Sequence, residues 1–145
     1  MLIQIDPSSD LPLYEQLTRQ VTFLVAQRAY REHELVPSVR EVSKSLAVNP
    51  NTVVRAYRQL QQDGILVVRR GMGMAVAESG CQRAATVRTQ IVADRIRITL
   101  VELRQSGLRD NEIRDTFLRL LEDGSSESAA TANAGDTLQS KETSS

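Results

Sequence analysis

The stretch "SLAVNPNTVVRAYRQLQQDG", residues 45–64, carries the signals of one short helix. Asn49 is a favourable N-cap because its side-chain oxygen can accept a backbone N–H. Pro50 suits the first helical position, where no N–H is needed, and Gly64 is typical of the position just past a helix end. The stretch therefore predicts a helix that begins after Asn49 and ends before Gly64.

This helix has an apolar side and a polar side. Its apolar residues recur at spacings of four and three, namely Val53, Tyr57 and Leu60. The other side carries amide, hydroxyl and guanidinium groups, on Asn51, Thr52, Arg55 and Arg58. These groups can simply cap the helix and meet water, or they can bind a polar partner. The flanking sequence favours the second interpretation.

The segments around this helix predict a winged helix-turn-helix domain. Upstream, residues 13–30 show helical spacing of Leu13, Leu17 and Val21, and Ser38 and Glu41 have the spacing of a capping box for a helix to about residue 46. Downstream, "ILVVRRGMGMAV" reads as two short strands with a glycine-containing tip. The order is helix, helix, turn, helix, hairpin.

The C-terminal region predicts two helices that need an additional neighbour. Residues 85–106 carry two apolar stripes on opposite faces of one helix, and a second helix starts near Asp110. That second helix can cover only one stripe, so a second copy of the chain is expected to cover the other. The expected dimer interface includes Val87, Ile91, Val92, Ile96, Ile98 and Leu100.

These patterns predict a mainly α fold with a small β-hairpin, divided into four segments. The winged helix-turn-helix domain spans residues 1–77, a linker spans 78–84 and a helical dimerisation region spans 85–123. Residues 124–145 contain one large aliphatic residue, and residues 123–145 hold four acids against one lysine. Residues 124–145 are therefore expected to form a disordered acidic tail.

Composition narrows the class of function. The formal net charge is zero, but residues 38–78 hold six Lys or Arg against three acids, which mildly favours nucleic acid. The single cysteine, Cys81, cannot form an internal disulfide, and no signal peptide or membrane-spanning run is recognisable, so we expect a cytoplasmic protein without membrane contact. No residue set is typical of a catalytic centre, a metal site or a cofactor site, so we expect none of these.

In a helix-turn-helix, the second helix of the motif enters the major groove of DNA and its N-terminal residues meet base edges. Asn can pair with adenine, and Thr or Arg suits bases and phosphates. The alternative is a winged helix that docks on a partner protein. Salt dependence separates the two, because phosphate contacts release counterions.

The run "VPSVREVSKSLAVNPNTVVRAYRQLQQDGILVVRRGMG", residues 36–73, resembles the winged-helix signature of the GntR family of bacterial transcription regulators, closest to its YtrA-like subfamily. The resemblance implies a homodimeric, sequence-specific regulator, most often a repressor, on an inverted-repeat operator of double-stranded DNA. It names no effector. It implies DNA contacts by Arg40, Asn49, Asn51, Thr52, Arg69, Arg70 and Gly71. With Arg55 and Arg58 from the outer face of the helix and Ser38 at the start of the preceding one, these residues make up the expected DNA-binding set.

The turn before the second helix and the wing depart from the family pattern. The glycine that usually precedes the second helix is replaced by His33 or Glu34, and the wing carries Met72 and Met74 where polar or aromatic residues are usual. Wing contacts by side chains beyond Arg70 are therefore not expected.

Overall fold

A computed structural model describes the backbone of residues 1–139 and the side chains of residues 1–125. The chain divides into two compact units, Met1–Arg95 and Ile96–Ser145. Within the described residues, no helix combines the length and the apolar content that a bilayer crossing requires.

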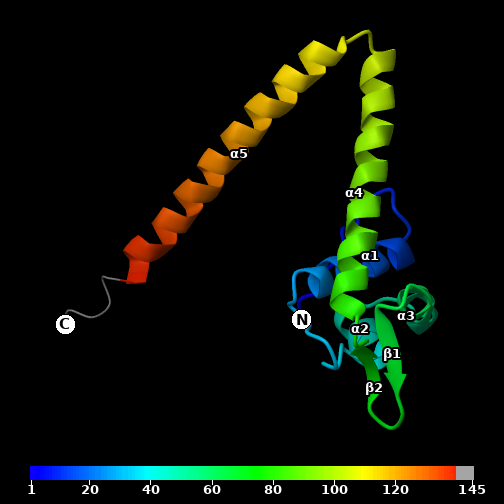
Figure 1. Ribbon diagram of the computed structural model, residues 1–145. Helices are drawn as coiled ribbons and strands as arrows, with labels where there is room; N and C mark the ends of the chain where they lie inside the picture. Colours follow the sequence, from blue (N-terminus) through cyan, green and yellow to red (C-terminus); the bar gives the residue numbers. More distant parts are fainter. Residues whose placement is uncertain (140–145) are drawn as a thin grey trace, which may run out of the picture. The chain divides into compact units, whose positions relative to one another are not determined.

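The first unit has the predicted winged helix-turn-helix order (Figure 1). It contains α1 (Leu13–Ala26), α2 (Val39–Leu46), α3 (Pro50–Gln62), β1 (Leu66–Arg69) and β2 (Gly73–Val76), followed by the first part of α4. Helix α1 is shorter than the predicted 13–30. Its end is followed by Arg28, whose φ of 61° lies in the left-handed region and cannot continue the helix.

The helix caps that the sequence predicts are present. The Ser38 hydroxyl accepts from the backbone N–H of Glu41, and the Glu41 carboxylate accepts from the backbone N–H of Ser38, both at 3.1 Å. The Asn49 side chain accepts from the backbone N–H of Asn51 at 2.8 Å. The starts of both helices of the helix-turn-helix are thus fixed by local hydrogen bonds.

The wing is an antiparallel hairpin that gains a third segment. Leu66 pairs with Val76 and Arg69 with Gly73, and Leu35 forms an isolated bridge to Ala75. His33 donates its backbone N–H to the Val76 carbonyl while holding φ at 68°. His33, and not Glu34, therefore occupies the left-handed position for which glycine is the unstrained choice.

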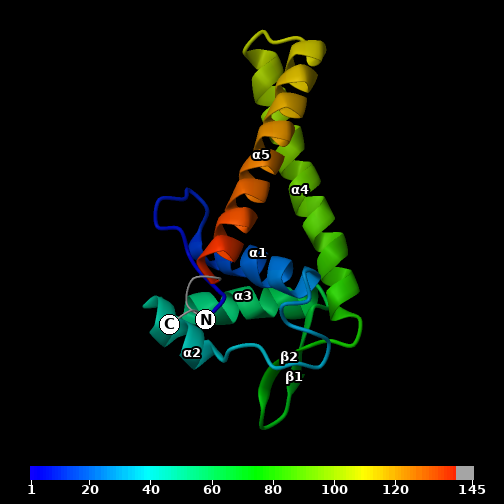
Figure 2. The ribbon, with the colours of Figure 1, turned by 90° about the vertical axis from the view of Figure 1, so that its left-hand side faces the viewer.

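The core of this unit lies between α1, α2 and α3. Leu17, Val21 and Val25 of α1 are buried, as are Val42 of α2 and the predicted inner face of α3, with Ala56 added: Val53, Ala56, Tyr57 and Leu60. Figure 2 shows α1 and α3 side by side. The Tyr57 hydroxyl donates to the Pro37 carbonyl, and burial raises the pKa of its phenol.

The N-terminal segment contributes more to this core than its sequence suggests. Ile3 is almost fully buried, and the Gln16 side chain on α1 accepts from the backbone N–H of Asp6 at 2.8 Å and donates to the Leu11 carbonyl at 3.0 Å. The N-terminal segment is thereby held against α1 by hydrogen bonds.

The predicted linker is wrong for residues 80–84, which are helical. Helix α4 runs Gly80–Gln105, and its first turns are packed into the first unit, with Gly80, Cys81 and Ala84 buried. A Cβ at Gly80 would lie 2.6 Å from the Ile65 carbonyl oxygen. Small side chains let the helix approach the hairpin closely, so Cys81 is a core residue and not a linker thiol.

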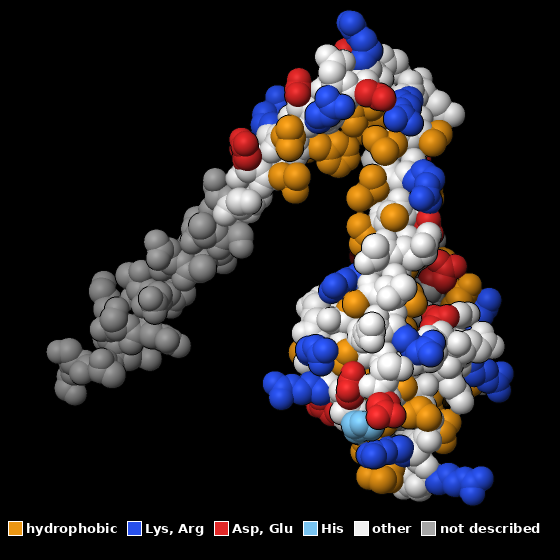
Figure 3. Space-filling model, viewed as in Figure 1, with side chains coloured by type: hydrophobic (Ala, Val, Ile, Leu, Met, Phe, Trp, Pro, Cys, Tyr) orange, Lys and Arg blue, Asp and Glu red, His pale blue; other side chains and the backbone are white. Residues whose placement is uncertain are grey.

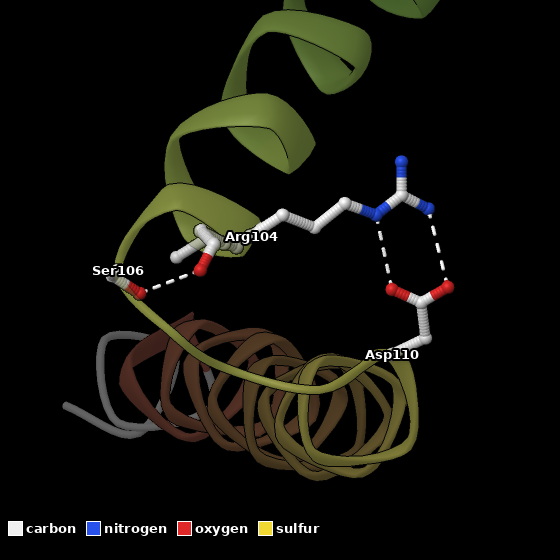
Figure 4. A network of polar contacts seen from close by, with 4 residues as sticks. Arg104, Ser106 and Asp110 are labelled. Atoms are coloured by element: carbon white, nitrogen blue, oxygen red, sulfur yellow. Dashed lines mark hydrogen bonds and ion pairs between the residues drawn. The ribbon is translucent and has the colours of Figure 1, made fainter.

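The second unit contains the end of α4 and α5 (Asp110–Gln139). Gly107, with φ of 93°, lies in the turn between them. Arg104 donates two hydrogen bonds to the Asp110 carboxylate, at 3.0 and 3.3 Å, and the Ser106 hydroxyl donates to the Leu103 carbonyl (Figure 4). These hydrogen bonds lower the pKa of Asp110.

The backbone of α5 is helical through Gln139, whereas the sequence predicts a disordered tail from residue 124. This stretch contains four alanines and no proline, and alanine has the highest helix propensity. Residues 140–145 of the predicted tail lie outside the described residues.

Candidate nucleic-acid interface

The outward face of α3 is polar and concave. Asn51, Arg55 and Arg58 are exposed there, and Thr52 and Val54 are half-buried. A hollow of about 510 Å³ is lined by Asn51, Val54, Arg55, Arg58, Gln59 and Gln62. The lining offers amide donors and acceptors together with two guanidinium groups. This is the set of groups that recognises base edges and phosphates.

Two members of the predicted DNA-binding set already serve as caps. The Ser38 hydroxyl and the Asn49 side-chain oxygen accept backbone N–H groups of α2 and α3. Their local role is to fix the helix starts that carry Arg40 and Asn51. An anion near either start would also meet the positive end of a helix dipole.

Three of the predicted cations keep their hydrogen-bonding groups available. Arg40 lies in the first turn of α2, Arg58 on the outer face of α3, and Arg70 in the turn between β1 and β2, and all three are exposed. The structure gives none of the three an ion pair or hydrogen bond to another described side chain. They can therefore donate to a nucleic acid without breaking a contact within the protein.

Arg55 differs from these three. Its guanidinium carbon lies 3.6 Å from the centre of the Tyr14 ring, which belongs to α1. The distance and the cation over the ring face define a cation–π contact. The sequence predicts Arg55 as a free DNA contact, whereas the structure holds it against another helix.

Arg69 also has a partner within the protein. Its guanidinium donates to the His33 carbonyl at 3.3 Å, which ties the end of β1 to the segment before α2. Gly71 at the tip has φ of 74° and open space around its Cα, so a backbone there can approach a partner closely.

Three residues of this surface were missed by the sequence analysis. Gln59 and Gln62 line the hollow on α3, and Tyr14 stacks on Arg55 from α1. The glutamines follow Asn51, Arg55 and Arg58 on the helical period, so extending the outer stripe by one turn finds them. Tyr14 has no such signal, because it lies far from α3 in the sequence.

The predicted dimer set divides between the two units. Val87 packs against the core of its own chain, and Ile91 shares with it a groove beside α1 and α3, where Tyr14 and Gln59 also lie. Val87 is thus half-buried within its own chain, and part of its side chain remains exposed. In the second unit, Ile96 and Leu100 face Ile113 and Phe117 across a cavity of about 310 Å³. Val92 and Ile98 are exposed on α4.

Figure 3 shows hydrophobic side chains gathered on facing sides of the end of α4 and the start of α5. Ile96 remains 48% exposed, and Leu118, Leu120 and Leu121 are also exposed on α5. The stripe that includes Ile96 and Leu100 therefore faces α5, which covers it only in part, and the opposite stripe, with Ile98, is exposed as well.

No three His, Cys, Asp or Glu side chains come together as a metal ion would need anywhere in the described part of the chain. A capped helix pair, a polar outer face on its second helix and a basic hairpin define a winged helix-turn-helix DNA-binding protein.

Comparison with known proteins agrees with this class and gives the family. The family model described as "Bacterial regulatory proteins, gntR family" matches residues 13–76. YtrA from Sulfolobus acidocaldarius, a GntR-family transcription factor of known structure, is 30% identical with a TM-score of 0.52, over 65% of this chain and 97% of that one. The chain belongs to the GntR family and is a DNA-binding transcription regulator.

Two further relatives extend the likeness into the C-terminal region. The HTH-type transcriptional repressor YtrA of Bacillus subtilis (strain 168) is 28% identical over 114 residues, which cover 79% of this chain and 88% of that protein. A transcriptional regulator from Oenococcus oeni, of known structure, is 25% identical with a TM-score of 0.61 over 81% of this chain and 97% of that one.

Proposed function

We propose that the protein is a homodimeric repressor that binds an inverted-repeat operator in double-stranded DNA, in the cytoplasm. The observation that carries this proposal is the apolar groove of the second unit. Ile96, Leu100, Ile113 and Phe117 line it, and Ile96 and Phe117 remain 48% and 39% exposed. Apolar groups that one chain leaves uncovered in this way are typical of a surface that a second copy covers.

The apolar surface that the groove leaves uncovered determines how much free energy association can gain. Complete burial of one aliphatic side chain is worth about 1.5–3 kcal/mol, and in a two-fold interface every such residue counts twice. Ile96, Leu100 and Phe117 are already partly covered within one chain, so their remaining burial, counted on both chains, is worth about half of this, on the order of 5–9 kcal/mol. This is comparable to the entropy cost of bringing two chains together, which is on the order of 4–15 kcal/mol.

A two-fold dimer presents two α3 helices in opposite senses, and this is why we infer an inverted repeat. In this arrangement Asn51 reads base edges while Arg40, Arg58 and Arg70 bind phosphates. Repression is inferred from the similarity to the Bacillus subtilis repressor, and its physical basis is occlusion of DNA by the bound dimer.

The proposal is tested by selecting duplexes from a random library with the full chain and measuring the mass of the free protein by sedimentation. The selected duplexes should contain an inverted repeat, and the free protein should sediment as a dimer. Single half-sites or a monomer at micromolar concentration would contradict the dimeric model.

Salt dependence tests DNA binding itself. Each phosphate contact should contribute about −0.9 to the slope of log K against log salt. A slope near zero, or no selected duplex at all, would favour a winged helix that docks on a partner protein.

A further inference from the structure

The contact between Arg55 and Tyr14 is the one cation–π contact among the described residues. Tyr14 lies in the first turn of α1 and is half-buried, and Arg55 lies on α3 with its side chain exposed. The two helices that form the contact are therefore the recognition helix and a helix outside the helix-turn-helix motif. A ring at this place can act on the orientation of the arginine.

Stacking leaves the donors of Arg55 unused. A guanidinium that lies over an aromatic ring keeps its five N–H groups directed outward in its own plane. Arg55 forms no hydrogen bond or ion pair with a described residue, whereas Arg69 and Arg104 both donate to oxygens of the protein. Arg55 is held by its face and not by its edge.

The N–H groups at the edge of this guanidinium are available on the candidate DNA-binding surface. Arg55 lines the hollow on α3 together with Asn51 and Arg58. An arginine that was needed only to join α1 to α3 could form an ion pair with a nearby carboxylate, and Glu15 lies next to Tyr14 on α1. The structure instead pairs Glu15 with the Tyr14 hydroxyl at 3.2 Å.

We propose that Tyr14 is a positioning residue for DNA binding, which holds the Arg55 guanidinium in the orientation in which it donates to a phosphate of the operator. The proposal rests on DNA binding by this protein and adds a residue outside the recognition motif. Its physical basis is preorganisation, because an arginine that is ordered before binding loses less rotamer freedom on binding.

Preorganisation predicts effects that differ between the two residues. Arg55→Ala removes a phosphate contact and should reduce the magnitude of the salt slope by about 0.9. Tyr14→Leu leaves the arginine able to reach the phosphate, so the slope should stay and affinity at fixed salt should fall about 3–10-fold. Tyr14→Phe keeps the ring and should bind within about twofold of the unchanged protein.

The decisive measurement is the double variant. If Tyr14 acts through Arg55, Tyr14→Leu should have no further effect on affinity in the Arg55→Ala background. If Tyr14 only stabilises the fold, the loss should appear in both backgrounds. Tyr30→Leu is the matched control, because Tyr30 is a half-buried tyrosine of the same unit that also packs against the core but does not contact α3 arginines.

The duplexes selected by the unchanged protein serve as probes, and urea unfolding of each variant verifies that it is folded at the assay temperature. Full affinity of a folded Tyr14→Leu variant, or failure of Tyr14→Phe to restore binding, would overturn the positioning role. If Tyr14→Leu is unfolded, Tyr14→Met replaces it, with the same outcomes. If the DNA affinity of the unchanged protein does not depend on salt, the proposed function itself is refuted. The two failures are therefore distinguishable.

Discussion

The two units of this protein differ in how completely they bury their apolar side chains. In the first, Leu17, Val53 and Leu60 are at most 1% exposed, and polar groups such as the Tyr57 hydroxyl find partners in the same unit. In the second, among the described residues, Ile113 is buried while Ile98, Val101 and Leu121 remain about half exposed or more. The first unit closes its own core and the second does not.

This difference separates two kinds of stability. A closed core is a property of one chain and does not depend on protein concentration, whereas an open apolar groove gains its burial only when a partner arrives. The unit that carries the candidate DNA surface is thus expected to be stable by itself, and the other unit is expected to become stable by association.

The largest expected effect comes from Ile96→Asp in the groove. A carboxylate cannot be buried among aliphatic side chains without a large cost, and the loss counts twice in a dimer. We expect dimer dissociation to increase more than a hundredfold, from a loss above about 3 kcal/mol, while the first unit stays folded. Sedimentation and circular dichroism measure both effects.

The matched control is Gln105→Asp, an exposed polar position on the same helix that receives the same charge. It should leave the dimer intact. If Ile96→Asp also unfolds the first unit, the two units are not independent and the comparison fails.

Leu60→Ala tests the closed core. Leu60 is fully buried on α3, so its truncation should lower the free energy of unfolding of the first unit by about 2–5 kcal/mol. Val68→Ala, at an exposed wing position, should change it by less than about 0.5 kcal/mol. Urea titrations at two protein concentrations should give the same loss for Leu60→Ala, because the contacts lie within one chain.

Asn51→Ala separates reading of DNA from folding of the unit that reads it. Asn51 is exposed and its side chain is not used by the α3 cap, so stability should hardly change. If the amide reads a base, affinity should fall by about 1–3 kcal/mol on the selected operator and little on random duplex. Equal losses on both duplexes would assign the amide to a phosphate.

His33→Gly tests how much backbone strain the first unit contains, because glycine adopts the left-handed conformation of this position without strain. The left-handed φ of His33 costs a side-chain residue about 1–2 kcal/mol, and the added freedom of glycine in the unfolded chain returns about half of this. We expect a net gain of about 0.5 kcal/mol in urea unfolding. His33→Ala keeps the Cβ and should bring no such gain.

The smallest effect is expected for Asp110→Asn at the turn between α4 and α5. The Arg104 hydrogen bonds lower the pKa of the Asp110 carboxyl below its ordinary value of 3.8. A lowered pKa stabilises the fold above that ordinary value, and this contribution is lost as pH falls through the native pKa. The thermal midpoint should therefore differ slightly between the two proteins at pH 6, and the difference should vanish near pH 2.

A difference that persists near pH 2 would show that the asparagine acts through something other than the lost charge. The carboxylate is fully exposed, so added salt at pH 6 should also reduce the difference by screening.

The sequence predicted those features that depend on neighbours along the chain. The capping box at Ser38, the N-cap at Asn49, the inner face of α3 and the hairpin follow from hydrogen bonds and periodicities that span a few residues. The order and spacing of these local features also revealed the resemblance to the GntR family, which the comparisons confirm.

Only the tertiary structure decided how distant segments share side chains. Tyr14 meets Arg55 across two helices, Arg69 reaches the carbonyl of His33, and Gly80 approaches Ile65, and each pair lies 15 or more residues apart. The same holds for the stripe of α4 that faces α5, since both stripes have the same period in sequence. Hydrogen bonds and periodicity along the chain determine which side chains each helix or strand exposes. Tertiary packing then decides which of these side chains contact other parts of the protein and which remain available to DNA or a second chain.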